Sequence, residues 1–388
     1  MTERDPGAGS LPQRASSEKL HVGRPNIGNR ERLMARIGDL LDRRWLTNAG
    51  PYVLEIEARL AEYLGVKHVI ATCNATVALE IAIKALGLEG EVIVPSFTFV
   101  ATAHALQWQG ITPVFGEIDP RTHMLDPEHA EMLITPRTTG IVGVHLWGDT
   151  CDVDGLQAVA DRHGLTLLFD AAHAFGCSRK GTMVGNFGAA EVFSFHATKF
   201  FNTFEGGAIA TNDGSLAQKM RLMKNFGFSG YDNVVSVGTN GKMSEISAAM
   251  GLTTLESIDE LIAVNRRNYL RYRDGLEGMP AVRFLDHHDE RERSNFQYIV
   301  VEIDNALARA SRDDIMNGLW GQNVLARRYF YPGVHNMEPY RTLAPHQRML
   351  LPRTEALVQR TLVLPTGTAV TDDDVDFICR FIRAAVGA

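Results

Sequence analysis

Two ionisable residues of opposite charge follow strand-like apolar runs near the middle of the chain. Asp170 ends the run "LTLLFD", and Lys199 comes 29 residues later in "SFHATKFF". A carboxylate buried at the end of a strand needs a partner, because an unpaired buried charge is costly. An ε-amine held in a site can attack a carbonyl group and can carry a proton. Lys199 is therefore a candidate amine nucleophile that is held in a site.

Other polar and aromatic residues follow strand-like runs in the same way. Asn74 opens the helical pattern "NATVALEIAIKALG", so the backbone N–H groups of Ala75 and Thr76 are predicted to be available to an anion. Phe99 follows "VIVP", and Ser194 ends "AEVFS". An acid, a lysine, an anion-binding helix start and an aromatic residue at one sheet edge suggest a flat ring that bears a phosphate.

These residues require a scaffold that brings the ends of several strands together. Continuous apolar runs separated by helical patterns are typical of a mostly parallel sheet that is covered by helices on both faces. Ligands of such sheets bind at the carboxyl ends of the strands. The predicted strands are 68–72, 91–95, 112–118, 140–146, 165–170, 190–195 and 207–211.

The organisation of the chain changes after about residue 255. A long charged helical pattern leads to "FQYIVVEI" and then to further helices, which predicts a smaller α+β domain. We therefore expect a large domain over residues 21–255 and a small C-terminal domain over residues 256–388. Residues 1–20 mix charges with Gly, Ser and Pro, which predicts a disordered arm.

Composition excludes several classes of protein. The net charge is −7, with 39 basic and 46 acidic residues, so no nucleic-acid or anionic-membrane partner is expected. No apolar run approaches the roughly 20 residues that span a bilayer. The four cysteines form no CxxC motif, which favours a reducing compartment, and the start of the chain lacks the apolar core of a signal peptide. We expect a cytoplasmic protein without a metal site.

The order of these motifs resembles that of a known family. "LFDAAHAFG" followed by "SFHATKFFNTFEGGAIATND" is similar to the nucleotide-sugar aminotransferases of the DegT/StrS type, which are pyridoxal phosphate (PLP) enzymes with the aspartate-aminotransferase fold, fold type I. The resemblance runs from about residue 22 to the C-terminus. "VGVHLWG", "SFHATK", "KMSE" and "LPTGTA" look most like the 4-aminotransferases that act on dTDP-linked 4-keto-6-deoxyglucose.

The resemblance implies roles for the residues around the cofactor ring. Lys199 would form the Schiff base with PLP, and Asp170 would bind the pyridine nitrogen. Phe99 would cover one face of the ring. His173 would lie against or beside the ring; the family most often has Gln at this position, so His173 is a departure from its pattern.

The resemblance also implies a composite phosphate site. Ala75, Thr76 and Ser194 would bind the phosphate together with Asn240 of a second subunit, so the protein would be a homodimer with shared active sites. The arginine that the family usually has near this point is Lys242 here. An anion contact attributed to that position is therefore in doubt.

The implied reaction moves an amino group, with glutamate as the donor, to carbon 4 of a nucleotide-linked 4-keto-6-deoxy sugar. Tyr331 and His335 in "FYPGVH" match a loop that lies near the sugar nucleotide in the family, although a structural role is equally open. Amination at carbon 3 or of a keto-inositol also remains open. Lys199 and the scattered cysteines oppose a PLP-dependent sugar dehydratase, and the acidic charge with the complete Lys199–Asp170 pair opposes a non-catalytic regulator.

Overall fold

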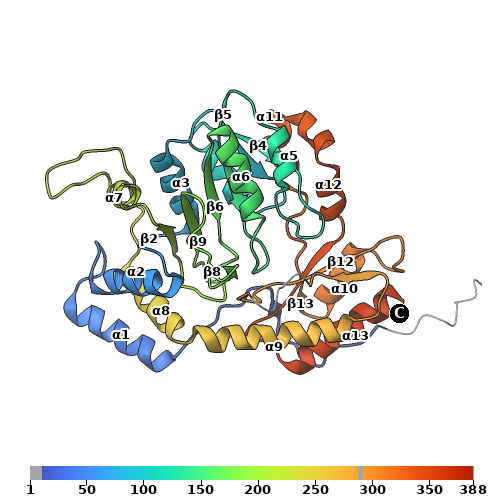
Figure 1. Ribbon diagram of the computed structural model, residues 1–388. Helices are drawn as coiled ribbons and strands as arrows, with labels where there is room; N and C mark the ends of the chain where they lie inside the picture. The colour runs from blue at the N-terminus through green and yellow to red at the C-terminus, as the bar shows by residue number, and fades with distance from the viewer. Residues whose placement is uncertain (1–10, 287–291, 388) are drawn as a thin grey trace, which may run out of the picture.

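The centre of the molecule is a seven-stranded sheet (Figure 1). The structure is a computed structural model that describes residues 11–286 and 292–387. The strand order is β2-β10-β9-β6-β5-β3-β4, and only β10 runs antiparallel to its neighbours in this sheet. The predicted mostly parallel sheet is confirmed, with strands β2 (His68–Thr72), β3 (Glu91–Pro95), β4 (Thr112–Gly116), β5 (Thr138–Val144), β6 (Thr166–Asp170), β9 (Ala190–Ser194) and β10 (Gly207–Thr211).

Helices cover both faces of this sheet, as the continuous apolar strands predict. Along β3, Val92 and Val94 pack into one buried cluster, whereas Ile93 packs into another on the opposite face. Successive side chains of a strand point to opposite faces, so a strand that is apolar throughout is buried on both sides. The first face is covered by α3 (Ala75–Leu86), α4 (Ala101–Gln107) and α7 (Gly214–Met223), and the second by α2 (Pro51–Leu64), α6 (Val153–His163) and α8 (Glu245–Glu256).

The C-terminal domain has a separate core beneath a small antiparallel sheet. Tyr272, Ile299, Leu362 and Phe381 are all buried in that core. The predicted boundary at residue 255 falls in the last turn of α8 (Glu245–Glu256). The elements are α9 (Ile258–Leu276), β11 (Val282–Phe284), β12 (Ile299–Ile303), α10 (Arg312–Gly321), β14 (Thr361–Leu364) and α13 (Asp372–Val386), with strand order β11-β12-β14.

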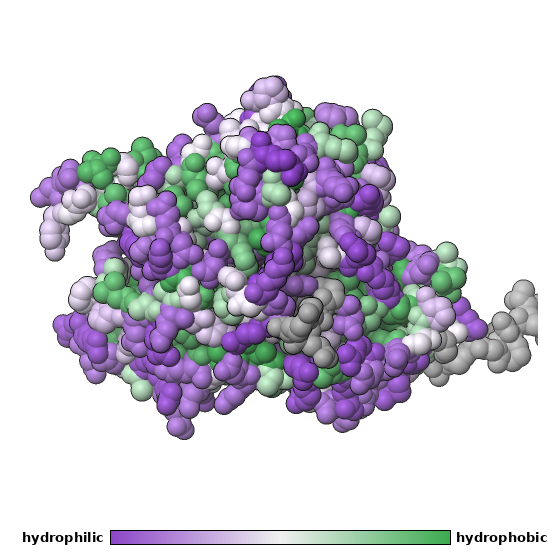
Figure 2. All heavy atoms as spheres, viewed as in Figure 1, coloured by the Kyte–Doolittle hydropathy of each residue, from purple (hydrophilic) through white to green (hydrophobic). Residues whose placement is uncertain are grey.

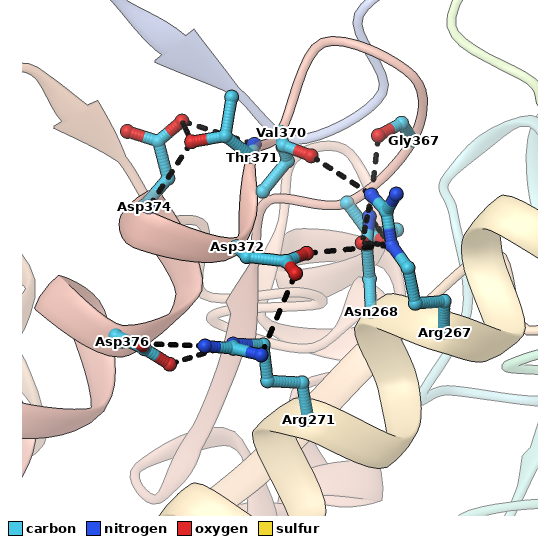
Figure 3. Close-up of polar contacts among 10 residues, drawn as sticks. Arg267, Asn268, Arg271, Gly367, Val370, Thr371, Asp372, Asp374 and Asp376 are labelled. Atoms are coloured by element: carbon cyan, nitrogen blue, oxygen red, sulfur yellow. Dashed lines mark hydrogen bonds and ion pairs between the residues drawn. The ribbon is translucent and has the colours of Figure 1, made fainter.

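Polar contacts join α9 to the start of α13 in this domain (Figure 3). Arg271 donates two hydrogen bonds of 2.7 Å to the carboxylate of Asp376. The buried Asn268 donates to the backbone oxygen of Gly367 at 3.2 Å. A bidentate arginine–carboxylate pair adds geometric specificity, while the buried apolar side chains supply most of the stability. These contacts fix the segment that connects β14 to α13.

Part of the expected N-terminal arm packs against the C-terminal domain. Residues 1–10 lie outside the described residues. Within the described part, Arg14 donates to Asp374 at 2.8 Å, and Leu20 is buried where β1 (Leu20–His21) pairs with β13 (Val324–Leu325). The expectation of disorder therefore does not hold for residues 14–20, because an ion pair and a strand pairing with distant residues tie them down.

One loop of the large domain extends away from it. Residues 227–239 form the projection beside α7 in Figure 1, and hydrophobic residues are visible on it in Figure 2. Tyr231 is fully exposed, and Val235 and Val237 are also exposed. An apolar projection of this kind is typical of a protein–protein contact.

The remaining elements are short or lie at the edges of the two domains. These elements are α1 (Arg30–Arg43), α5 (Pro127–Met132), β7 (Ser178–Arg179), β8 (Thr182–Met183), η1 (Val334–Asn336), α11 (Tyr340–Leu343), η2 (Pro345–Leu350) and α12 (Pro352–Val358).

None of the helices among the described residues is long and apolar enough to cross a membrane.

Candidate active site

A cavity of about 710 Å³ lies at the carboxyl ends of the central strands. Strands β6 and β9 are parallel neighbours, so Asp170 and Ser194 end at the same edge of the sheet. Strand β10 pairs antiparallel with both β2 and β9, so β2 runs parallel to β9. The carboxyl end of β2 leads into α3 at this same edge. The cavity is lined by seven of the ten predicted site residues: Ala75, Thr76, Phe99, Asp170, His173, Ser194 and Lys199.

Lys199 extends into the cavity from a turn that follows β9. The turn is closed by a 2.8 Å hydrogen bond from the Lys199 backbone N–H to the carbonyl of His196. The Nζ atom donates to the hydroxyl of Tyr298 at 3.0 Å. Burial of the amine lowers the pKa of Lys199 to about 8, and the nearby Asp170 partly opposes this shift. A substantial fraction of this amine is therefore neutral near physiological pH, as a nucleophile or proton carrier requires.

Asp170 is buried at the end of β6, and its carboxylate is held by two donors. Thr102 donates its hydroxyl to Oδ2 at 2.8 Å, and the backbone N–H of Ala172 donates to Oδ1 at 3.0 Å. Burial raises the pKa of Asp170, whereas Thr102, Ala172 and Lys199 favour the ionised form. Each carboxylate oxygen still has a lone pair for a further donor. The site thus presents a fixed, incompletely paired acid to the cavity.

His173 lies near this pair and carries an unpaired nitrogen. Its Nδ1 is buried and has no hydrogen-bond partner among the described residues. Burial, with a smaller contribution from the charge of Lys199, lowers the pKa of His173 well below the usual value, so the imidazole is neutral. Its ring centroid is 4.2 Å from that of Tyr298. A buried polar atom without a partner costs free energy, which a bound molecule with a matching group would recover.

The start of α3 forms another wall of the cavity. The side chain of Asn74 caps the helix by accepting the N–H of Val77 at 2.9 Å. A helix has no internal partner for its first N–H groups, so those of Ala75 and Thr76 suit an anion. Gly207 lets β10 and the start of α3 pack close together, since a Cβ atom at this position would lie 2.7 Å from the backbone nitrogen of Ala75.

The outer part of the site is more open. Phe99 is 60% exposed and lines both the cavity and an adjoining hollow of about 580 Å³. Tyr331 lines only the hollow, where the guanidinium carbon of Arg328 lies 4.0 Å from the centre of its ring. Tyr331 therefore lines the adjoining hollow, whereas Lys199 lines the cavity.

Two predicted residues are placed elsewhere. His335 is buried, with Nδ1 bonded to the Ser96 hydroxyl at 2.5 Å and Nε2 to Glu355 at 2.7 Å. Both ring nitrogens are occupied, so this geometry matches the structural role left open for His335. Asn240 is exposed beside the projecting loop and is not among the described residues that line the cavity.

The structure also places residues in the site that sequence reasoning missed. Thr102 holds Asp170, while Tyr298, Tyr329 and Phe330 form a wall that comes from the far end of the chain. Thr102 could have been considered, because it lies three residues after Phe99 in the segment that follows a predicted strand. No local signal marks Tyr298, which precedes a buried strand 99 positions after Lys199.

The family model described as the DegT/DnrJ/EryC1/StrS aminotransferase family matches residues 28–383, almost the whole chain. The chain belongs to this aminotransferase family. The expectation of an aminotransferase is therefore confirmed, and with it the fold that the motifs predict.

Several known proteins are similar to this aminotransferase over nearly their full length. The dTDP-4-amino-4,6-dideoxy-D-glucose transaminase of Shigella dysenteriae is 37% identical over 94% of this chain and 98% of its own. The crystal structure of DesI in the presence of its TDP-sugar product is 50% identical, with a TM-score of 0.91 over 97% of this chain and 95% of that one. A putative sugar aminotransferase of Streptococcus pneumoniae, solved in a PLP form, is 26% identical, with a TM-score of 0.87 over 95% and 98% of the two chains.

Proposed function

We propose that this aminotransferase uses PLP to transfer an amino group from glutamate to carbon 4 of a dTDP-linked 4-keto-6-deoxy sugar, producing a 4-amino-4,6-dideoxy sugar nucleotide. The observation that carries the proposal is the cavity in which Lys199, Asp170 and the start of α3 meet. The names of the Shigella relative and of DesI support a dTDP-linked sugar, and the Shigella name supports carbon 4.

The residues of the cavity fit PLP in their chemistry. Lys199 supplies an amine for the cofactor aldehyde, and Asp170 supplies a buried carboxylate for its ring nitrogen. The unpaired Nδ1 of His173 suits a polar substituent of the ring. The N–H groups of Ala75 and Thr76, together with the hydroxyls of Thr76 and Ser194, suit its phosphate. Phe99 at the cavity mouth offers an aromatic face.

Asp170 and Lys199 would have different roles in the reaction. When bound, PLP supplies an electron-withdrawing ring that stabilises the negative charge left when a C–H bond beside the amine is broken. Asp170 would keep the ring nitrogen protonated by a charge-assisted hydrogen bond. Lys199 would take up and return the proton at its Nζ, and its lowered pKa of about 8 suits both tasks near neutral pH.

The adjoining hollow supports a nucleotide-linked substrate. It contains the aromatic rings of Phe99, Tyr329 and Tyr331, together with the guanidinium groups of Arg327 and Arg328. Aromatic faces suit a nucleobase, and guanidinium groups suit a diphosphate. Tyr331 is accordingly proposed as a substrate-binding residue. His335 is proposed to support the same loop instead, because its ring nitrogens are bonded to Ser96 and Glu355.

We also propose a homodimer with shared sites, in which Asn240 of the partner subunit contributes to the phosphate site. Asn240 is exposed and follows the projecting loop 227–239, whose apolar side chains would be covered in a dimer. A symmetric dimer would place both copies of this segment at the same interface.

A substrate panel with the purified protein and PLP tests this function. The cofactor-bound protein should absorb visible light, and borohydride should fix the mass of the cofactor on the peptide that contains Lys199. Glutamate should then support amination of a dTDP-4-keto-6-deoxy sugar, with the new C–N bond located by nuclear magnetic resonance. Amination at carbon 3, or of a keto-inositol alone, would overturn the proposed substrate, and a lack of any transamination would overturn the proposed reaction.

A further inference from the structure

Tyr298 enters the cavity from the C-terminal domain and touches the lysine of the large domain. It immediately precedes β12 and is only 6% exposed. Its hydroxyl accepts a hydrogen bond of 3.0 Å from Nζ of Lys199. Its ring lies 4.2 Å from the ring of His173 and 5.4 Å from that of Trp147, measured between centroids. The ring is held by packing, so the hydroxyl has a fixed position beside the amine.

We propose that Tyr298 is a positioning residue for Lys199, holding the amine at the cavity wall whenever the amine is not covalently engaged. This inference rests on the proposed function and assigns one more residue to it. A lysine side chain has several rotatable bonds, and restricting them costs conformational entropy. One fixed hydrogen-bond partner removes part of that cost from each catalytic cycle.

A phenol suits this task because it can bind the amine in both of its protonation states. Burial raises the pKa of Tyr298 well above its usual value, so the hydroxyl keeps its proton. A protonated phenol accepts a hydrogen bond from an ammonium group and donates one to a neutral amine. Lys199 can therefore gain or lose a proton without leaving its partner.

Within the part of the chain that the structure describes, the other groups that face Lys199 do not form a hydrogen bond with its Nζ. Asp170, at the end of β6, acts on the amine as a negative charge, and the hydrogen bonds that its carboxylate accepts come from Thr102 and Ala172. His173, which follows β6, is neutral because burial lowers its pKa. His196 and Glu205 line the cavity but carry exposed side chains and pair with each other at 3.4 Å. The hydroxyl of Tyr298 is the group in hydrogen-bond contact with Nζ.

Tyr298→Phe separates positioning from packing, because it keeps the ring beside His173 and Trp147 and removes only the hydroxyl. Tyr340→Phe is the matched control. Tyr340 is equally buried, and its hydroxyl is bonded to His104 at 2.7 Å, outside the residues that line the cavity. A general effect of losing one buried hydroxyl would be the same in both variants.

The first readout needs neither cofactor nor substrate. The full chain without added PLP is treated with acetic anhydride over a range of pH, and acetylation of Lys199 is measured by peptide mass spectrometry against the exposed Lys180. In the unaltered protein, half-maximal reactivity is expected near pH 8. In Tyr298→Phe the midpoint should fall further, because a charge-assisted bond to the phenol oxygen is stronger than a neutral one and its loss disfavours the ammonium form. Tyr340→Phe should leave the midpoint unchanged.

The second readout is the steady-state rate with PLP. Tyr298→Phe should lower kcat about five-fold, the scale of one hydrogen bond, and change KM less than two-fold. An unchanged acetylation midpoint together with an unchanged kcat would overturn the inference, as would equal changes in Tyr340→Phe. If the unaltered protein transfers no amino group, the proposed function fails, and the acetylation profile still decides whether Tyr298 holds Lys199.

Discussion

The inner and outer ends of the active-site cavity differ in how completely the chain itself fixes them. At the inner end, Asp170 is held by Thr102 and Ala172, and Lys199 is held by Tyr298, at distances between 2.8 and 3.0 Å. At the outer end, Phe99 is 60% exposed, and Asn240 lies on the surface. A rigid inner end suits chemistry, which requires preorganised groups, whereas an open outer end suits residues that act only when a substrate or second subunit is present. The comparison predicts that inner changes affect the rate most and outer changes affect binding.

Removal of the lysine should have the largest effect. We expect Lys199→Ala to fold normally and to lose transaminase activity by on the order of 10⁴-fold, the upper range for a positioned acid–base group. The matched control is Lys180→Ala, since Lys180 is exposed and forms an ion pair with Asp154 at 2.9 Å, outside the residues that line the cavity. Steady-state rates and circular dichroism check both variants. Normal activity in Lys199→Ala would contradict the central assignment of this site.

Replacement of the buried acid should rank second. Asp170→Asn keeps the size of the side chain but cannot hold a proton on a ring nitrogen through a charge-assisted bond. We expect kcat to fall by on the order of 10²-fold or more, the scale of removing one preorganised electrostatic partner, while cofactor binding is retained. Absorption of the bound cofactor and stopped-flow rates measure the two properties separately. A rate close to normal would mean that another group holds the ring nitrogen.

A change at the outer end, at Asn240, should affect cofactor binding in the site of the partner subunit. Asn240→Asp places a negative charge near the proposed phosphate site, and like-charge contact should weaken cofactor binding by about ten- to a hundred-fold. Mixing this variant with Lys199→Ala under subunit exchange should restore activity in up to about a quarter of the sites, because random exchange makes half of the dimers hybrid and each hybrid has one complete site.

This test has two controls. Each variant alone must be strongly impaired at the cofactor concentration used, and subunit exchange must be verified by native mass spectrometry. Activity that stays at zero despite exchange, or an active protein that sediments as a monomer, would show that Asn240 does not act across an interface.

The smallest expected effect is on stability. Folding lowers the pKa of Lys199 from about 10.5 to about 8, so without cofactor the folded state binds fewer protons than the unfolded state between these values. The free-energy cost of burying the charged amine is fully present below pH 8 and disappears as the pH rises through 10.5. The shift corresponds to about 3 kcal/mol, and the loss of the hydrogen bond to Tyr298 offsets about 1 kcal/mol of it. Lys199→Met should therefore stabilise the cofactor-free protein by about 2 kcal/mol near pH 7 and by progressively less above pH 8. Denaturant unfolding at several pH values checks the trend, and a gain independent of pH would point to packing instead.

The sequence by itself determined the central sheet, the residues at its edge and the family. Apolar runs that are buried on both faces must form a covered parallel sheet, and residues that directly follow such strands must lie at the carboxyl edge. Lys199, Asp170 and Ala75 could be grouped in this way because local pattern decides where a strand ends. The motifs around them, in order, carried the family resemblance.

Only the tertiary structure decided which distant side chains complete the site. Tyr298 and Phe330 reach the cavity because the C-terminal domain packs on the edge of the sheet, and nothing in the residues around them encodes that contact. The same packing engages both ring nitrogens of His335 with Ser96 and Glu355, although its motif resembles a substrate loop. Local sequence sets the conformation of each element, but contacts between distant elements depend on how their apolar surfaces fit together, which no single segment specifies.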